Sequence, residues 1–225
     1  MFYIYHHLGL GDHIICNGMT RHFAEIFDQV TVFCHPHNEN NVKYMYRDNN
    51  NICTMPIEEH DIENFLKSSY KKYIKVGFEN LHQHNNSNFT FDQAFYKLAG
   101  LDFSIRFNKF YLDRDLEKEN EVLTRLNPNN EKYIFVCDDP DRGFIMDENK
   151  FRKDLKIIKN NKNINIFNIL KLLENAEEIH TMQTSILDLC NSFVLSKPKI
   201  YLHTYIRNYP SFIESKGLNQ IRKIY

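Results

Sequence analysis

The sequence predicts an α/β fold made of two Rossmann-like lobes. Short apolar segments alternate with amphipathic segments along the chain, which is typical of a parallel sheet with helices on its faces. The polar cluster NPNNE at 127–131 interrupts this alternation and is typical of a turn between domains. The alternation then starts again with KYIFVCDD at 132–139. We therefore expect one lobe at 1–127 and a second lobe at 128–225.

The first lobe is expected to open with a strand and a helix. The segment FYIY at 2–5 is apolar and aromatic, so it predicts a buried strand. From His13 onward, apolar residues recur at helical spacing, which predicts a helix. A polar loop at 79–88 precedes a helix that ends at Gly100, since glycine commonly follows a helix. Between these segments, strands are expected at 30–36, 51–57 and 72–78, and helices at 38–48 and 59–70.

A charged run at 113–121 predicts the start of a helix that lies before the boundary, in the first lobe. The second lobe is expected to repeat the pattern. The strand KYIFVCDD follows the boundary, and the segment at 156–176 reads as a short strand and a strongly apolar helix. The remaining elements are two strands and the helix between them, expected at 177–182, 184–196 and 199–205. The tail at 211–225 is expected either to form a last helix or to fray.

Composition and charge limit the possible classes of function. The chain has 225 residues and a formal net charge of −1, so it has no basic excess for general nucleic-acid binding. No segment is long and apolar enough for a membrane span, and MFYIYHHLG lacks a charged leader before an apolar core. The five cysteines are far apart without zinc-site spacing, which favours buried free thiols in a reducing compartment. We expect a cytoplasmic protein without nucleic-acid partners.

Two glycines and an aspartate follow the first strand, as Gly9-Leu10-Gly11-Asp12. Glycine is used where the backbone needs a positive φ or must approach another group closely. Between a strand and a helix, such a turn lets a ligand reach the backbone and the positive helix end. Ile14 replaces the third glycine of the dinucleotide fingerprint, and no P-loop lysine follows. Asp12 could act as a general base toward a hydroxyl, or it could simply cap the helix.

A second candidate site is CDDPDRGF at 137–144, after the first strand of the second lobe. Arg142 lies in this loop, and a guanidinium can hold a phosphate through two hydrogen bonds. Alternatively, carboxylates in the same loop pair with this arginine at the surface; they are Asp138, Asp139 and Asp141. Both interpretations stay open from the sequence. The spacing of the carboxylates is not that of a calcium-binding loop.

A third candidate is EIHTMQTSILDL at 178–189, where a strand passes into a helix. Ser185 followed by Asp188 resembles a capping box that opens the helix. The free N–H groups of a helix N-terminus, with the hydroxyls of Thr184 and Ser185, suit a diphosphate. His180 would point near the same edge. The alternative is an ordinary helix cap beside a strand histidine with structural hydrogen bonds.

Two histidine pairs are weaker candidates for a metal site. His35 and His37 flank a proline, and His82 and His84 lie in an asparagine-rich segment. Neither pair has the i, i+4 helical spacing or a carboxylate partner that a metal site commonly shows. Surface histidines are the favoured interpretation, and no metal or cofactor is expected.

Together these segments resemble small bacterial and viral glycosyltransferase-like proteins of the GT-B fold. The resemblance covers nearly the whole chain, and its glycine turn is similar to that of the heptosyltransferase group, whose members carry Gly-Asp after the first strand. It implies two lobes that face one another across a cleft, here in a compact version because 225 residues is short for this fold. The segments that carry it are HLGLGDHIICNGMTRHF, FDQAFYKLAGLDFSIRFNKFYLDRD, FVCDDPDRGF, NIFNILKLLENAEEIHTMQTSILDLCNSF and KIYLHTYIR.

The resemblance also implies roles for individual residues. Asp12 corresponds to the catalytic base, and Gly9, Gly11 and His13 are expected beside the substrate in the same loop. His180, Thr184 and Ser185 correspond to the donor-nucleotide site, with Arg142 toward the diphosphate. In place of a uniform serine pair this sequence has MQTS at 182–185, which makes Thr184 a less direct match.

The function that follows is transfer of a sugar from a nucleotide-sugar donor to an acceptor hydroxyl, metal-independent and inverting, in glycan or polysaccharide synthesis. The partners are a nucleotide sugar and a glycan or small-molecule acceptor. Two alternatives use the same scaffold: a non-catalytic nucleotide- or carbohydrate-binding protein, and a sugar-nucleotide epimerase. The sequence does not specify the donor base, the sugar, the acceptor or the oligomeric state.

Overall fold

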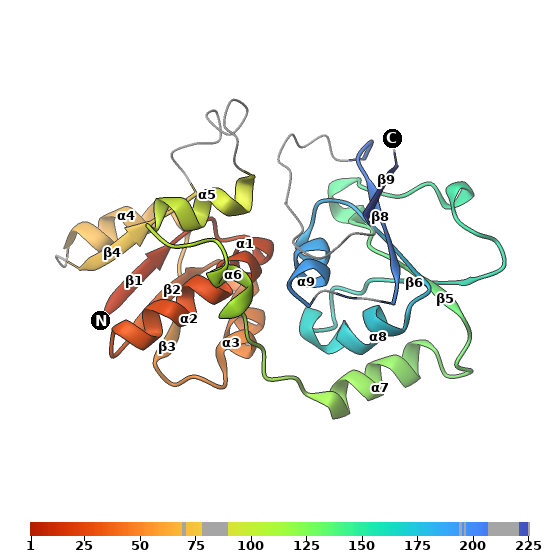
Figure 1. The fold of residues 1–225 in the computed structure, drawn as a ribbon, viewed down its shortest axis with the longest axis horizontal. Helices are drawn as coiled ribbons and strands as arrows, with labels where there is room; N and C mark the ends of the chain where they lie inside the picture. The colour runs from red at the N-terminus through yellow and green to blue at the C-terminus, as the bar shows by residue number, and fades with distance from the viewer. Residues whose placement is uncertain (69–70, 78–89, 194, 196, 207–220, 225) are drawn as a thin grey trace. The chain divides into compact units, whose positions relative to one another are not determined.

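The fold was analysed in a computed structural model of the 225-residue chain. The structure describes residues 1–68, 71–77, 90–193, 195, 197–206 and 221–224. The chain forms two compact units, of which the first holds Met1–Asp113 and the second begins at Arg114. Each unit has its own sheet of parallel strands (Figure 1). The predicted α/β class with two parallel-sheet units is therefore confirmed.

The first sheet has four parallel strands in the order β3-β2-β1-β4. Strand β1 lies in the interior of the sheet, and all four of its residues are buried. Because parallel strands end at the same edge of a sheet, the segments that follow β1, β2 and β4 gather there. The strands are β1 (Phe2–Tyr5), β2 (Val30–Cys34), β3 (Ile52–Pro56) and β4 (Lys72–Lys75).

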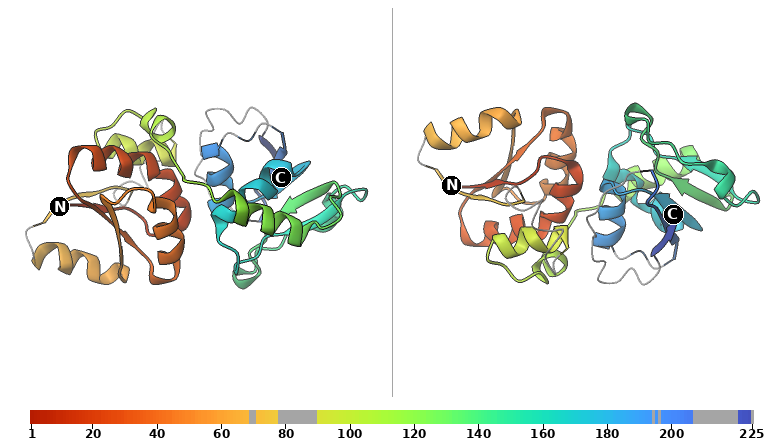
Figure 2. Two further views of the ribbon diagram at one scale, coloured as in Figure 1. Left: turned by 90° about the horizontal axis from the view of Figure 1, so that it is seen from below. Right: turned by 90° about the horizontal axis from the view of Figure 1, so that it is seen from above.

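Helices cover both faces of the first sheet. Figure 2 shows α2 and α4 on opposite faces. Helix α4 buries Ile62 and Leu66 against Tyr3 and Phe33, so its apolar stripe faces the sheet. The helices are α1 (Leu10–Ile15), α2 (Asn17–Ile26), α3 (Glu39–Tyr46), α4 (Glu59–Ser68), α5 (Phe91–Leu98) and α6 (Ile105–Asn108), with a 3₁₀ turn η1 (Pro36–Asn38).

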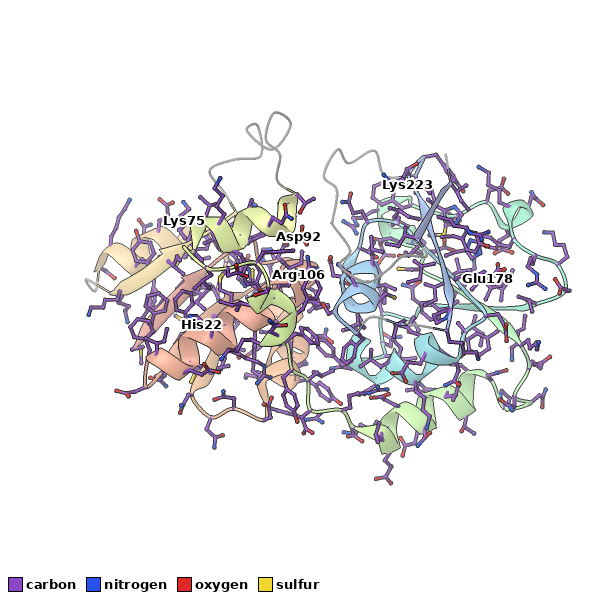
Figure 3. All side chains as sticks on the ribbon, in the orientation of Figure 1. His22, Lys75, Asp92, Arg106, Glu178 and Lys223 are labelled. Atoms are coloured by element: carbon purple, nitrogen blue, oxygen red, sulfur yellow. The ribbon has the colours of Figure 1, made fainter. Side chains whose placement is uncertain are left out.

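A buried ion pair joins α5 to α6. Asp92 and Arg106 point toward one another, and both side chains are fully buried (Figure 3). The Thr90 hydroxyl also donates to Asp92, so the carboxylate has two partners. Helix α2 approaches α6 so closely that a Cβ on Gly18 would collide with the Ile105 carbonyl oxygen. Glycine at this position is therefore required by packing.

The second sheet has five parallel strands in the order β6-β5-β7-β8-β9. The chain turns to one side after β5 and to the other side after β6, so the strand order reverses between β5 and β7. Ligands of open α/β sheets bind at the carboxyl ends of strands at such a point. The strands are β5 (Tyr133–Val136), β6 (Lys156–Lys159), β7 (Glu178–Thr181), β8 (Lys199–His203) and β9 (Ile221–Ile224).

The two faces of the second sheet are covered differently. On one side lie η5 (Ile166–Ile169), α8 (Leu170–Asn175) and α9 (Ser185–Phe193) (Figure 1). The connection from β5 to β6 contains only the short turns η3 (Pro140–Arg142) and η4 (Glu148–Lys150). Its side chains Met146 and Phe151 pack on Ile134 and Val136. An irregular segment thus takes the place of a helix on this face.

The boundary between the units falls at Asp113 and Arg114, earlier than the expected boundary after residue 127. Helix α7 (Leu116–Leu126) is part of the second unit because it packs against η5 and α8. Arg114 fixes this arrangement by donating to Glu119 and to Glu174, the latter at 2.6 Å from Nη1. The turn cluster 127–131 lies between α7 and β5, inside the second unit.

The C-terminal end of the chain is a strand. The tail was expected to be a helix or to fray, but Ile221–Ile224 forms β9, because its backbone pairs in register with β8. The loop expected at 79–88 and the tail before residue 221 lie outside the described residues. In the described part of the chain, no helix is both long and apolar enough to cross a bilayer.

Candidate functional site

Asp12 lies in the first turn of α1, at the carboxyl end of β1. The helix begins at Leu10, earlier than the predicted start at His13, so Gly11 and Asp12 are helical residues. Gly9 is the N-cap residue and Asp12 is the third helical residue. The expectation that Asp12 is the N-cap is therefore wrong. Its half-buried carboxylate sits in the first turn, where the helix dipole favours a negative charge.

Gly9 makes a close approach to the Asp12 side chain, and its φ is not positive. Its φ of −65° and ψ of 145° are open to any residue. A Cβ at this position, however, would lie only 2.6 Å from Asp12 Oδ2. The carboxylate of Asp12 therefore folds back over the Gly9 backbone, and any larger residue at position 9 would displace it. The position of the carboxylate therefore depends on the glycine.

His13 is enclosed within the first unit. It is fully buried against His6, with ring centroids 4.4 Å apart in an edge-to-face arrangement. Among the described residues, neither ring nitrogen of His13 has a hydrogen-bond partner. Burial lowers the pKa of His13 well below its usual value, with further lowering by His6 and His35. Burial also lowers the pKa of His6 to about 4, so both imidazoles are neutral at pH 7. The expected contact of His13 with substrate stays a prediction.

Neighbouring residues hold the loop between β1 and α1 in place. His7 Nε2 lies 2.9 Å from the Gly77 carbonyl oxygen, which ties the loop to the end of β4. Asn38 Nδ2 donates to the Leu8 carbonyl oxygen at 3.2 Å and ties it to the end of β2. The backbone of Gly9 is thereby fixed from both sides.

Of the two histidine pairs considered for metal binding, the structure describes one. His35 and His37 stack with ring centroids 5.1 Å apart at the end of β2. His82 and His84 lie outside the described residues. Within the described ranges, no group of three or more histidine, cysteine, aspartate or glutamate side chains could hold a metal ion.

Arg142 pairs with a carboxylate of its own loop. It ends η3, and its Nε donates to Asp139, as the ion-pair alternative proposed. Asp139 also accepts a hydrogen bond from Lys162 Nζ at 2.9 Å. Burial raises the pKa of the Asp139 carboxyl, but the Arg142 and Lys162 cations together lower it by more, so the pKa is below its usual value. About half of the Arg142 side chain remains exposed, at 53%. The guanidinium therefore keeps donors directed to solvent while its Nε is fixed.

Asp138 has a separate structural role. Its carboxylate accepts from the Met146 backbone N–H at 2.9 Å and pairs with Lys159 at 2.9 Å. It thereby fastens the β5–β6 connection to the sheet. The three carboxylates of this loop are engaged by lysine and arginine side chains, which accounts for their number without a bound ion.

Thr184 and Ser185 lie at the start of α9, after β7. The helix begins at Ser185, and the Thr184 carbonyl accepts from Leu187 N at 2.9 Å. Ser185 is thus the first helical residue and not the N-cap residue that the expected capping box of Ser185 and Asp188 requires. Thr184 Oγ1 lies 3.5 Å from Cys137 Sγ, which follows β5. These hydroxyls therefore lie where the strand order reverses, the place at which such sheets bind ligands.

His180 belongs to the buried face of the second sheet. Its Nδ1 lies 2.9 Å from His203 Nε2, and its Nε2 lies 3.3 Å from Glu178 Oε2. His203 Nδ1 in turn lies 3.1 Å from Tyr205 Oη. The sequence did not predict that Glu178, His203 and Tyr205 form one network with His180, although both strands alternate polar and apolar residues. His180 has the structural hydrogen bonds of the alternative interpretation, and its contact with a donor nucleotide stays a prediction.

The five cysteines are free, as expected, and all but Cys53 are buried. Burial raises the pKa of Cys34 and of Cys137 to about 11. A thiol with so high a pKa is a poor nucleophile at neutral pH.

The predicted site residues thus fall into two groups. Gly9, Gly11 and Asp12 lie together at the edge of the first sheet, whereas Arg142 and Thr184 follow β5 and β7 in the second unit. That the two groups face one another across a cleft stays a prediction.

Comparison with known proteins gives a likeness of fold. No protein-family profile matches the sequence, and no curated protein matches it. Among solved structures, ADP-heptose LPS heptosyltransferase II of E. coli is similar, with a TM-score of 0.57 at 8% sequence identity. The match covers 99% of this chain and 89% of that chain. The chain therefore has a GT-B-like fold, similar to that of a heptosyltransferase.

Proposed function

We propose that this protein is a glycosyltransferase that moves a sugar from a nucleotide-sugar donor to an acceptor hydroxyl. The observation that carries the proposal is the position of Asp12. Its half-buried carboxylate lies at the carboxyl end of β1, an interior strand of a parallel sheet, where α/β enzymes bind substrates. The GT-B-like fold supports the same activity by analogy.

In this proposal Asp12 is the general base. It takes the proton of the acceptor hydroxyl while the acceptor oxygen attacks the anomeric carbon. The bond from that carbon to the diphosphate breaks, the nucleoside diphosphate leaves, and the anomeric configuration inverts. The second unit would hold the leaving diphosphate through the hydroxyls of Thr184 and Ser185, the N-terminus of α9 and Arg142. No metal ion is needed in this scheme, and addition of EDTA to the assay tests that point.

The experiment is a donor screen with a base variant. ADP, UDP, GDP and CMP sugars are offered with mixed acceptors, and release of the nucleotide is followed. Asp12→Asn keeps the size of the side chain but removes the base, so turnover is expected to fall about 100- to 10,000-fold. Asp28→Asn, which changes an exposed carboxylate of the same unit, is the matched control and should leave turnover unchanged. Equal turnover in Asp12→Asn and the wild type contradicts the proposal.

Gly9→Ala provides a second arm of the same experiment. The backbone at position 9 accepts alanine without strain, but the new Cβ would occupy the space beside Asp12 Oδ2. The carboxylate stays chemically intact and moves, so turnover is expected to fall about 100-fold, as displacement of a catalytic group by about 1 Å does. An unchanged rate would show that the position of this carboxylate does not matter.

The other interpretations have separate outcomes in this screen. Nucleotide binding without release of product from any donor would indicate a binding protein on the same scaffold. Conversion of a donor without an acceptor, with uptake of solvent deuterium into the sugar, would indicate an epimerase.

A further inference from the structure

A row of four hydrogen-bonding side chains crosses the second sheet. Glu178 and His180 come from β7, whereas His203 ends β8 and Tyr205 follows it. The three links measure 3.3 Å, 2.9 Å and 3.1 Å from the glutamate to the tyrosine. We call Glu178, His180, His203 and Tyr205 the histidine chain. Figure 3 labels Glu178 within the second sheet.

The histidine chain is buried at one end and exposed at the other. Glu178, His180 and His203 are at most 4% exposed, whereas Tyr205 is 40% exposed. Phe151 covers the two imidazoles, with its ring centroid 4.4 Å from that of His180. Tyr201 stacks on His180 at 4.7 Å. Solvent therefore reaches the chain at its tyrosine end.

The buried end fixes the direction of every hydrogen bond at neutral pH. An ionised carboxylate only accepts, so His180 Nε2–H donates to Glu178. A neutral imidazole has one N–H, so His180 Nδ1 accepts from His203 Nε2–H. By the same rule His203 Nδ1 accepts from the Tyr205 hydroxyl. The phenolic proton is thus directed inward, and Tyr205 Oη offers only lone pairs to solvent.

One additional proton reverses the His180–His203 and His203–Tyr205 bonds without moving a heavy atom, whereas His180 Nε2–H continues to donate to Glu178. A solvent proton binds Tyr205 Oη, and the original phenolic proton passes to His203 Nδ1. His203 then gives its Nε2 proton to His180 Nδ1. One proton has entered and none has left, and the positive charge rests on His180 beside Glu178. Tyr205 now accepts from His203 and directs an O–H donor to solvent.

A cation lies at the exposed end of the chain. Lys150 Nζ is 3.8 Å from the ring centroid of Tyr205. No described carboxylate pairs with Lys150, whereas Arg152 of the same connection, Lys159 at the end of β6 and Lys162 after it are in ion pairs. In the protonated form, the Lys150 ammonium over the ring and the Tyr205 hydroxyl are two donors at the same exposed end, and phosphate oxygens accept strong hydrogen bonds from charged donors.

We propose that the histidine chain relays one proton between solvent and His180, and that Lys150 and Tyr205 bind a phosphate group when that proton is present. The choice of a phosphate group rests on the proposed use of a nucleotide sugar, whereas the relay itself does not. Burial lowers the pKa of His203 to about 4 and lowers that of His180, with Glu178 opposing the shift at His180. The free protein therefore holds the neutral form at pH 7, and a bound anion favours proton uptake.

Other charged groups face the chain from the elements packed around it. Arg152 Nη1 lies 3.6 Å from Glu178 Oε1 and forms an ion pair with it. Asp138 raises the pKa of His203 and Lys150 lowers it. In the neighbouring strands, Lys199 pairs in register with Glu178 and Arg222 with Tyr201. Glu178 is thus the anionic neighbour of the extra proton when it rests on His180, and Asp138 acts on His203.

The first test reads the direction of the chain in the wild-type protein. Proton–nitrogen correlation spectra of ¹⁵N-histidine protein give the tautomer of each imidazole, and the variants His180→Gln and His203→Gln assign the signals. At pH 7.5 both rings are expected as Nε2–H tautomers. An Nδ1–H tautomer at either ring overturns the proposal, because the phenolic proton would then not be directed inward.

The second test measures binding and proton uptake by calorimetry. Inorganic pyrophosphate is the probe, at pH 5.5 and 7.5, in buffers of different ionisation enthalpy. At pH 5.5 the wild type is expected to bind about tenfold more tightly than Tyr205→Phe in the same buffer, with uptake of about one proton. Comparison within one buffer removes the titration of the probe itself. ADP and UDP arms show whether a nucleoside adds affinity beyond the phosphate group.

Two variants separate the relay from the cation. Glu178→Gln leaves Lys150 and Tyr205 in place but removes the anion that holds the extra proton, so uptake should be lost. Lys150→Gln should weaken binding at both pH values and keep the uptake. Uptake that persists in Tyr205→Phe, or no binding of any probe, overturns the phosphate site. If Asp12→Asn leaves sugar transfer unchanged while these results hold, only the proposed function fails.

Discussion

Each unit buries two histidines close together, and the two pairs differ in their partners. In the first unit, His6 and His13 meet edge to face with ring centroids 4.4 Å apart. His6 Nε2 and both nitrogens of His13 have no hydrogen-bond partner among the described residues. In the second unit, His180 and His203 share a hydrogen bond of 2.9 Å, and both rings have a further partner.

The difference shows that burial alone does not define the role of a polar side chain. Burying a polar group without a hydrogen bond costs free energy, whereas a satisfied pair returns part of that cost. The second pair therefore stabilises its sheet, and removing one member leaves the others unsatisfied. The first pair has no hydrogen bond between its rings, and the ring hydrogen bond that it does make joins His6 Nδ1 to the His7 carbonyl oxygen. Substitutions of the same kind should consequently have opposite consequences in the two units.

The largest expected effect comes from breaking the second pair. His180→Leu leaves the Glu178 carboxylate and His203 Nε2 buried without their partner. We expect the free energy of unfolding of the second unit to fall by about 3 kcal/mol, the lower end of the cost of breaking a buried charged network. Hydrogen exchange of the β7 amides measures this unit separately. A loss below about 1 kcal/mol would mean that the chain contributes little and would remove the contrast.

Acid should destabilise both units, and the first more strongly. A histidine whose folded pKa lies below the unfolded value of about 6.5 binds fewer protons when folded, so stability is fully present above pH 6.5 and is lost as pH falls toward the folded pKa. Burial lowers the pKa of both His6 and His203 to about 4. Glu178 and Asp138 oppose the shifts at His180 and His203, whereas no carboxylate opposes those at His6 and His13.

The measurement is amide exchange in β1 and in β7 between pH 6.5 and 4.5, corrected for the intrinsic rate. Each titrating group adds a slope of up to about 1.4 kcal/mol per pH unit. His13→Leu should flatten the dependence in β1 and leave that of β7 unchanged. Equal slopes in the two units would contradict the role given to the carboxylates.

Local sequence patterns were sufficient for most of the fold. The segment 2–5 forms β1, and the apolar runs of the second half form β5, β7 and β8, because alternation and apolar content are properties of short segments. The position of α7 was not predictable in the same way. It depends on Arg114 and Glu174, which lie 60 residues apart and meet only in the folded chain.

The candidate site likewise has contacts that follow from local sequence and contacts that depend on the folded chain. Gly9 and Asp12 are three positions apart, so their closeness follows from the first helical turn. The histidine chain depends on the register of two strands, in which His180 pairs with Tyr201 and thereby brings His203 within reach. No spacing in one strand specifies the register of another. His180 was therefore predictable as a candidate residue from the sequence, whereas its hydrogen-bond partners were not.

The smallest expected effect comes from the first pair. His13→Leu removes two nitrogens that have no partner among the described residues and keeps an apolar side chain of similar size. Since no hydrogen bond is lost, the free energy of unfolding at pH 7.5 should change by less than about 0.5 kcal/mol or rise. Denaturation of this variant beside His180→Leu makes the comparison direct, because both positions are buried and the substitution is the same. A loss as large as that in His180→Leu would show that His13 has a partner, such as an enclosed water molecule, and that the two pairs are alike.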